Sequence, residues 1–183
     1  MTAGAAVVFV EGASDRAALE ALAARRGLDL AAARVEIVAV GGAHALGRAL
    51  GERSGVRVAG IYDLGEERAI LAALARAGIA PDGFFACDPD LEGELVRALG
   101  PERMLALVAE RGRRSAFETY RRQPAKRALS LEAQLHGWLH NWKVEYAAPL
   151  VDALHLDRVP RPLDAVLAYA LGDAGRRTYV SST

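Results

Sequence analysis

The fold is predicted by the stretch AAVVFVEGASDRAALEALAARRG, which spans residues 5–27. Its first six residues form an apolar run that ends at Glu11 and Gly12, which is typical of a strand buried in a parallel sheet. The following residues place apolar side chains at helical spacing, with Ser14 as the expected N-cap and Gly27 as the expected stop. The stretch therefore predicts a strand, a short turn and an amphipathic helix.

The same order of strand and helix recurs three more times before residue 101. The later strands are predicted at residues 35–40, 56–62 and 83–87. The helices that follow them are predicted at residues 43–52, 66–78 and 91–100. Four alternations joined by short turns predict an α/β fold, with a mostly parallel four-stranded sheet flanked by helices.

From Pro101 onward, helical patterns replace the strands. Helices are predicted over residues 101–112, 115–128, 130–156 and 163–172. We therefore expect an α/β core at residues 1–112 and a helical C-terminal extension at residues 113–183. The extension should pack on the core within one compact domain.

Composition narrows the class of protein. Of the 183 residues, 52% are hydrophobic and 25% are charged, as expected of a globular rather than a disordered chain. The single cysteine, Cys87, excludes an internal disulfide and a multi-cysteine zinc site. The first residues lack the basic region of a signal peptide, and no run approaches the roughly 18 apolar residues of a membrane helix. We therefore expect a cytoplasmic protein with no membrane partner.

Three carboxylates fall directly after predicted strands. Glu11 follows the first strand, Asp63 the third and Asp88 the fourth. The carboxyl ends of parallel strands lie at one edge of the sheet, where ligand sites are built, so we expect these side chains to meet. Three further acids lie within four residues of these points: Asp15, Asp90 and Glu92.

Clustered carboxylates repel one another, and burial adds to that cost, so bound cations are the simplest compensation. Oxygen ligands favour hard cations such as Mg²⁺ or Mn²⁺. Two such ions about 4 Å apart can activate water and stabilise the leaving oxygen of an in-line displacement. The acids therefore predict metal-dependent phosphodiester chemistry.

Some of these acids also have a structural interpretation. Asp15 and Glu92 suit the first turn of a helix, and Asp90 suits an N-cap. Glu11 and Asp63 are harder to explain by local propensity, because each ends an apolar strand. As a group, the acids favour a site.

The opening segment VVFVEGASDRAALEAL (residues 7–22) resembles the first motif of TOPRIM domains, in which a strand delivers a glutamate followed by glycine. Two later segments strengthen the resemblance: CDPDLEGELVRALG (87–100) and NWKVEYAAPLVDAL (141–154). Together they resemble the TOPRIM nuclease domain of the OLD (overcoming lysogenization defect) family, over about residues 6–155. The resemblance implies a TOPRIM-like, Rossmann-like sheet.

The resemblance also implies cleavage of DNA with two Mg²⁺ or Mn²⁺ ions. Carried over by position, Glu11, Asp15 and Asp63 would hold one ion. Asp88 and Asp90, with Glu92 as a further candidate, would hold the other. Lys143 would neutralise charge that develops on the phosphate. Glu11 and Lys143 are thus the residues expected to be catalytic.

The chain departs from the family pattern in two places. The triplet Asp63-Leu64-Gly65 keeps only the first aspartate of the usual Asp-x-Asp, and Glu66 or Glu67 could replace the second. The sequence also contains no G-x-x-x-x-G-K-[ST] loop, so we expect a free-standing TOPRIM protein or one whose ATPase partner is a separate chain.

The charge pattern suggests where nucleic acid would bind. Residues 1–100 carry 14 acidic and 10 basic side chains, whereas residues 101–183 carry 9 and 13. The basic residues concentrate in one segment, which predicts phosphate contacts by Arg113, Arg114, Arg121, Arg122, Lys126 and Arg127. A solvated helix face is the alternative interpretation.

The sequence thus predicts a metal-dependent nuclease that acts on DNA, with RNA and the oligomeric state left open. Two alternatives stay open: a non-catalytic nucleic-acid-binding or regulatory module, which Gly65 favours, and a primase-like nucleotidyl transferase. His136 and His140 could pair on a metal but carry no assigned role, and Trp138 and Trp142 are expected to pack.

Overall fold

The computed structural model of the protein describes residues 5–51, 53 and 55–172. The four strands are β1 (Ala6–Val10), β2 (Val35–Ala39), β3 (Arg57–Asp63) and β4 (Phe84–Cys87). The helices that follow them are α1 (Ala13–Arg25), α2 (Ala43–Gly51), α3 (Glu67–Arg76) and α4 (Leu91–Leu99). The later helices are α5 (Pro101–Glu110), α6 (Arg114–Arg121), α7 (Leu131–Leu139), α8 (Lys143–Ala153) and α9 (Arg161–Leu171). None of these described helices has the length and apolar character needed to cross a membrane.

The strands form one parallel sheet in the order β2-β1-β3-β4. All five residues of β1, which lies inside the sheet, are buried. A strand that is covered on both faces has no solvent side, which explains its uninterrupted apolar run. The predicted four-stranded α/β fold is confirmed.

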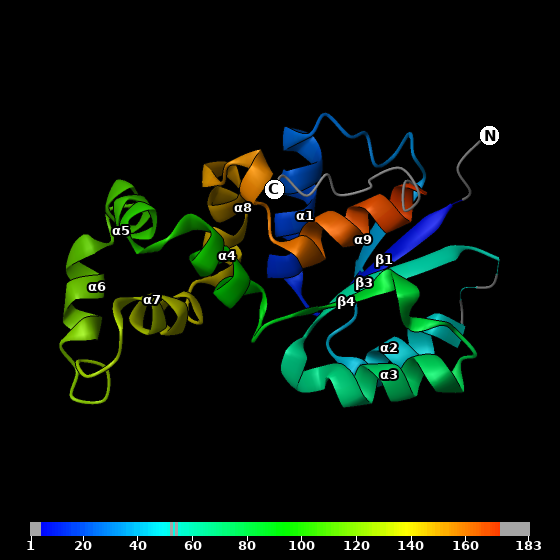
Figure 1. The fold of residues 1–183 in the computed structure, drawn as a ribbon, viewed down its shortest axis with the longest axis horizontal. Helices are drawn as coiled ribbons and strands as arrows, with labels where there is room; N and C mark the ends of the chain where they lie inside the picture. The colour runs from blue at the N-terminus through cyan, green and yellow to red at the C-terminus, as the bar shows by residue number, and fades with distance from the viewer. Residues whose placement is uncertain (1–4, 52, 54, 173–183) are drawn as a thin grey trace, which may run out of the picture.

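Two hydrophobic clusters cover opposite faces of the sheet. Val8 and Val10 belong to the cluster that includes the buried residues of α1, and Val7 and Phe9 belong to the cluster beneath α2 and α3. This division follows from the alternation of side chains along a strand. Figure 1 shows the resulting layers, with α1 and α9 on one side of the sheet and α2 and α3 on the other.

Helix α9 brings the end of the described chain back onto the sheet. It packs against β1, β3 and β4 beside α1. Arg26, at the end of α1, forms an ion pair with Asp164 of α9. Arg57 of β3 donates a hydrogen bond of 3.0 Å to the carbonyl of Ala170. The last helix of the predicted extension thus covers the sheet, while the division of the chain at residue 112 stays a prediction.

Helices α5, α6 and α7 form a lobe beyond α4, away from the sheet (Figure 1). We call these three helices the helical lobe. Phe117 of α6 is buried and meets Trp138 of α7 edge to face, with ring centroids 5.6 Å apart. Tyr120 contacts the same tryptophan at 5.5 Å. These aromatic pairs give the lobe its own packed centre, and Trp138 packs there as expected.

Some predicted helix bounds are wrong. The segment 130–156 is not one helix, because α7 ends at Leu139 and α8 begins at Lys143. This break lets α7 pack against α4 while α8 packs against α1. The basic segment stops being helical after Arg121, shortly before Pro124, which has no backbone N–H to donate.

The first helix also begins differently from the prediction. Its N-cap is Gly12 rather than Ser14, and the backbone N–H of Gly12 donates to Oδ2 of Asp15 at 2.8 Å. The predicted end of the second helix at residue 52 and the predicted extension at 173–183 lie outside the described residues.

Candidate metal centre at the carboxyl edge of the sheet

The turns at the carboxyl edge of the sheet are joined in pairs by backbone hydrogen bonds. The N–H of Gly41, which follows β2, donates to the carbonyl of Glu11, after β1, at 2.8 Å. The N–H of Leu64, after β3, donates to the carbonyl of Pro89, after β4, at 3.1 Å. The parallel pairing of β1 with β3 brings the two pairs of turns to one edge of the sheet.

Asp15 lies one turn into α1 and is half-buried. Its pKa is raised to about 6 by burial, the largest cause, and by the negative charges of Glu92 and Glu11. The hydrogen bond from Gly12 and the charge of Lys143 act in the opposite direction. The pKa of Asp15 therefore shows that it lies within electrostatic reach of acids from two other segments.

The pKa of Asp63, the last residue of β3, is raised more strongly than that of Asp15. This pKa is raised to about 7 by burial, the largest cause, and by the charges of Glu11, Asp90 and Asp15, with the charge of Lys143 acting in the opposite direction. We call the interacting acids Glu11, Asp15, Asp63, Asp90 and Glu92 the carboxylate cluster.

Lys143 is the cation of this cluster. Its Nζ atom lies 3.1 Å from Oε2 of Glu92, whose side chain is only 5% exposed. Burial alone would lower the pKa of Lys143, but the charges of Glu92, Asp63 and Asp90 raise it above its ordinary value. Lys143 therefore stays protonated and partly offsets the negative charge of the acids around it.

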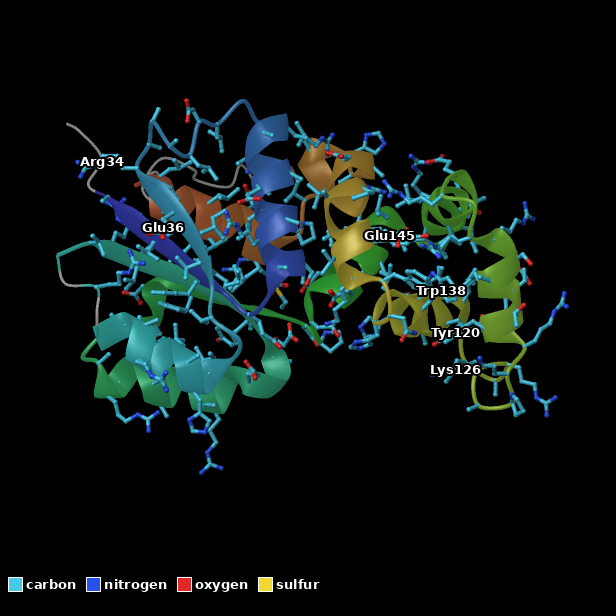
Figure 2. The ribbon with its side chains drawn as sticks, turned by 180° about the vertical axis from the view of Figure 1, so that it is seen from behind. Arg34, Glu36, Tyr120, Lys126, Trp138 and Glu145 are labelled. Carbon is cyan, nitrogen blue, oxygen red and sulfur yellow. The ribbon has the colours of Figure 1, made fainter. Side chains whose placement is uncertain are left out.

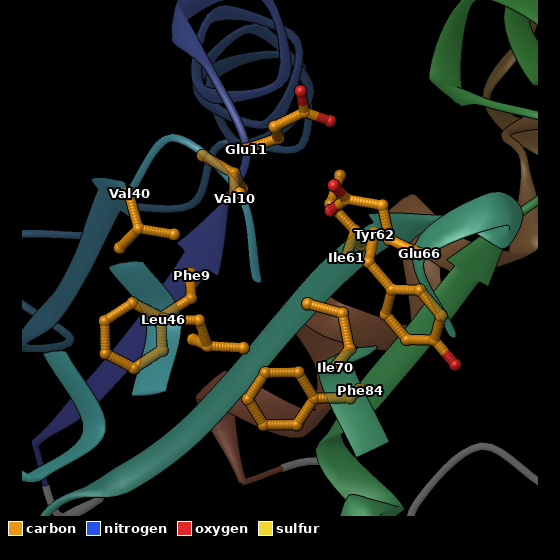
Figure 3. Close-up of a pocket in the computed structure, with 11 residues that line it drawn as sticks. Phe9, Val10, Glu11, Val40, Leu46, Ile61, Tyr62, Glu66, Ile70 and Phe84 are labelled. Carbon is orange, nitrogen blue, oxygen red and sulfur yellow. The ribbon is translucent and has the colours of Figure 1, made fainter. Parts of the chain in front are cut away.

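Two glutamates compete for the place of the missing second aspartate, and their surroundings differ. Burial and the charge of Glu11 raise the pKa of Glu66. Figure 3 shows the carboxylates of Glu11 and Glu66 at the opening of a pocket that both residues line. Glu67 is exposed, and its Oε1 lies 3.4 Å from the hydroxyl of Tyr62. Of the two, Glu66 is the one that faces the carboxylate cluster.

Asp88 differs from the other predicted ligands. Its side chain is exposed, and it is not among the main charges that raise the pKa values of Asp15 and Asp63. Its backbone N–H donates to Oε1 of Glu94 at 3.1 Å, and its carbonyl accepts from Arg97. The structure thus brings five of the six predicted ligands together and leaves the side chain of Asp88 outside.

Asp90 has two partners that the sequence left without a role. Nε2 of His136 lies 2.8 Å from both carboxylate oxygens of Asp90. Nε2 of His140 lies 3.7 Å from Oδ2 of the same residue. The spacing of four residues between the histidines was the only sequence signal for this arrangement, and it gave no hint of Asp90 as the third member.

The predicted nucleic-acid-binding residues fall into two groups. Arg114, Arg122 and Arg127 are exposed. Arg113 instead lies over the Trp142 ring at 3.6 Å and donates to Glu145, and Arg121 donates to Gln134 at 3.2 Å.

Lys126 is partly exposed and also contacts a neighbouring side chain, with its Nζ 5.4 Å from the centre of the Tyr120 ring. Figure 2 shows Lys126, Tyr120 and Trp138 within the helical lobe and Glu145 on the neighbouring α8. Several of the predicted DNA contacts therefore also hold the lobe together.

The carboxylate cluster has the ligand chemistry of a divalent-cation site, although among the described residues only Asp90, His136 and His140 have ligand atoms that already lie within 4.8 Å of one another. At neutral pH, burial and mutual repulsion oppose the ionised forms of Asp15 and Asp63, as their raised pKa values show. A bound cation would remove that cost. The donors are carboxylate oxygens, which Mg²⁺ and Mn²⁺ prefer.

Comparison with known proteins gives an independent result. Residues 4–64 match the family described as "Overcoming lysogenization defect protein-like, TOPRIM domain". No curated protein sequence matches the chain significantly.

Solved structures of OLD proteins share the fold. The C-terminal region of the Burkholderia pseudomallei OLD protein superposes with a TM-score of 0.69 at 18% identity, covering 93% of this chain and 98% of that one. The C-terminal region of the Xanthomonas campestris pv. campestris OLD protein, phased with platinum, gives a TM-score of 0.68 at 19% identity, covering 93% and 94%. Its mercury-phased structure gives 0.67 at 19%, covering 92% and 95%. The likeness thus extends over the helical lobe as well as the sheet.

Proposed function

Since the chain carries a TOPRIM domain resembling that of OLD proteins, we propose that it is a metal-dependent nuclease that cleaves DNA by a two-metal mechanism. The observation that carries this proposal is the carboxylate cluster with Lys143 at its side. Acids with raised pKa values cluster at functional sites, and the carboxyl edge of a parallel sheet is where ligand sites are built.

The acids divide into two sets of ligands in this proposal. Glu11, Asp15 and Asp63 hold one ion, and Glu66 takes the place of the missing second aspartate. The other ion is held by Asp90 and Glu92, and Asp88 joins them in this proposal only by turning its exposed side chain toward the cluster. Bound divalent cations would supply an activated water and stabilise the leaving oxygen of the phosphodiester.

Lys143 has a separate task. It lies beside Glu92 and within electrostatic reach of Asp63 and Asp90. A protonated amine there stabilises negative charge as it develops on the phosphate during cleavage. The pairing with Glu92 orients the amine before the substrate arrives, so little reorganisation is needed at the moment of reaction.

The exposed arginines of the helical lobe supply contacts to the DNA backbone. The side chains of Arg114, Arg122 and Arg127 are open to solvent and can reach phosphates. Such contacts depend on charge and not on base sequence.

A non-catalytic regulatory module is the second candidate, and Gly65 favours it. The usual second aspartate of the Asp-x-Asp motif is missing at this position. If Glu66 does not replace it, the site would bind cations and nucleic acid without cleaving the phosphodiester.

Nicking of supercoiled plasmid with Mg²⁺ or Mn²⁺ tests the proposal, with single-stranded RNA as a parallel substrate. Glu11→Gln should lower the rate by at least about 100-fold, because it removes a charged ligand. Glu36→Gln, at an exposed acid of β2 that pairs with Arg53, is the matched control and should cleave at the wild-type rate. Equal rates for wild type and Glu11→Gln would remove the nuclease proposal. Saturable Mn²⁺ binding without cleavage would favour the regulatory module.

A further inference from the structure

Asp90, His136 and His140 form a compact group of side chains that shares Asp90 with the carboxylate cluster. Each offers one ligand atom, and these atoms lie within 4.8 Å of one another. Asp90 is the N-cap of α4, and the two histidines lie one turn apart at the end of α7. We call these three residues the histidine site.

The carboxylate of this site is held in a defined orientation. Asp90 is 8% exposed, and its Oδ1 accepts a hydrogen bond of 2.8 Å from the backbone N–H of Gly93. A Cβ atom on residue 93 would lie 2.7 Å from Cδ of Pro89, so the approach of backbone to carboxylate requires glycine. The rest of the Asp90 carboxylate faces the histidines.

The histidines provide access from solvent. The side chain of His136 is 26% exposed and that of His140 is 53% exposed. An open cavity borders His136 and is lined further by Pro89, Val96 and Arg97. An ion could therefore enter without unfolding any part of α4 or α7.

We propose that the histidine site binds a divalent transition-metal ion, of which Zn²⁺ is the clearest example. Two imidazoles and one carboxylate are a ligand set that Zn²⁺ and related ions accept, whereas Mg²⁺ prefers oxygen ligands alone. Three protein ligands leave a coordination position open for water or a phosphate oxygen. The site would thus differ in metal preference from the carboxylate cluster that it adjoins.

The distances suit such an ion after a small adjustment. Ligands about 2.0–2.1 Å from a tetrahedral zinc ion lie roughly 3.4 Å apart. The separation of 3.7 Å between His140 and Asp90 is close to this value. The 2.8 Å between His136 and Asp90 is a hydrogen-bond distance. A modest rotation of the partly exposed His136 side chain would lengthen it to ligand spacing.

Asp90 belongs to both groups. Both of its oxygens lie 2.8 Å from Nε2 of His136, and its charge is one of the causes that raise the pKa of Asp63, so it also lies within electrostatic reach of the acids at the edge of the sheet. An ion at the histidine site would therefore join α4 to α7 and fix the helical lobe relative to the carboxylate cluster. This inference goes beyond the proposed nuclease, since it concerns binding of metal in the absence of DNA.

Calorimetric titration of the full chain with Zn²⁺ tests the inference. The four histidines of the sequence provide matched variants, because His44 and His155 lie outside the site. His136→Gln and His140→Gln should each weaken the binding of one Zn²⁺ ion by more than tenfold. Loss of an outer-shell partner alone costs about 10–100-fold, and loss of a ligand costs more. His44→Gln and His155→Gln should bind as the wild type does.

Two further measurements keep the result independent of folding and of activity. Co²⁺ in wild-type protein should show the visible absorption of a nitrogen-ligated ion, and this spectrum should be lost in His136→Gln. A crystal of the wild type soaked in Zn²⁺ should give an anomalous peak among Asp90, His136 and His140. Glu11→Gln should abolish nicking and leave this Zn²⁺ ion in place, which separates the inference from the proposed function.

Three outcomes would overturn the histidine site. The first is Zn²⁺ affinity that is equal in wild type and in both site variants. The second is an anomalous peak only between Glu11, Asp15 and Asp63. The third is wild-type protein that binds no Zn²⁺, in which case His136 and Asp90 form a hydrogen-bonded pair and nothing more.

Discussion

Nζ of Lys143 lies 3.1 Å from Oε2 of Glu92, which joins the start of α8 to the first turn of α4. Glu92 is buried, and burying a carboxylate is costly unless it has a charged or hydrogen-bonding partner such as this one. The pair also brings a cation from the helical half of the chain to the acidic edge of the sheet. Stability and the proposed catalysis therefore depend on one contact.

Lys143→Met should affect both properties. The free energy of unfolding is expected to fall by about 1–3 kcal/mol, because a buried carboxylate loses its charged partner. Nicking activity should fall by about 100-fold or more, since the stabilising charge is gone. Urea unfolding and plasmid nicking measure the two effects. Lys143→Arg, which keeps the charge, should restore most of the stability, and unchanged activity in Lys143→Met would argue against its role.

Glu66→Gln and Glu67→Gln form a matched pair. Glu66 feels the charge of Glu11, whereas Glu67 lies beside the hydroxyl of Tyr62. We expect Glu66→Gln to weaken Mn²⁺ binding by about tenfold or more and Glu67→Gln to leave it unchanged. Calorimetry with Mn²⁺ provides the measurement. The reverse order of the two variants would assign the ligand role to Glu67 instead.

The stability of the metal-free protein should fall as the pH rises from 5 to 8. The folded-state pKa values of Asp15 and Asp63 are about 6 and about 7, above the ordinary value of 3.8. Both groups therefore bind protons more tightly when folded. Their contribution to stability is complete below the unfolded pKa and is lost as the pH rises through the folded pKa.

Asp63→Asn isolates the larger of these effects. The unfolding free energy of Asp63→Asn minus that of wild type should rise by about 1 kcal/mol between pH 5 and pH 8, with solvent screening taken into account. Urea unfolding in chelator measures this difference. Saturating Mg²⁺ should remove the widening, because the cation neutralises the site. Parallel stability curves for variant and wild type in chelator would contradict the prediction.

Arginines of the basic segment should divide into two classes on mutation. Arg122→Ala and Arg127→Ala remove exposed charges, so each should weaken DNA binding. Each should also reduce the slope of log affinity against log salt concentration by about one. Arg113→Ala should instead lower the free energy of unfolding by about 1–2 kcal/mol, because Arg113 stacks on Trp142 and pairs with Glu145. Fluorescence anisotropy at several salt concentrations and urea unfolding distinguish the classes. DNA affinity that falls most in Arg113→Ala would contradict the division.

Local patterns in the sequence were sufficient for the sheet and for the position of its acids. The apolar runs at 5–10, 35–40, 56–62 and 83–87 predicted strands close to those observed. A parallel sheet places the carboxyl ends of all its strands at one edge, so the order of strands and acids along the chain was enough to expect Glu11 and Asp63 together. Helix bounds were less predictable, because a turn such as that between α7 and α8 depends on what each helix packs against.

The amino-acid sequence by itself determined the α/β class, the parallel strands and the acids that end them, because these features depend on residues a few positions apart. Only the tertiary structure decided which distant side chains join the acids. It brings Lys143 to Glu92, sets His136 against Asp90, turns Glu66 rather than Glu67 toward Glu11, and engages Arg113 within the protein. Such contacts depend on how helices pack over one another, and the spacing of residues along one helix carries no information about its neighbour.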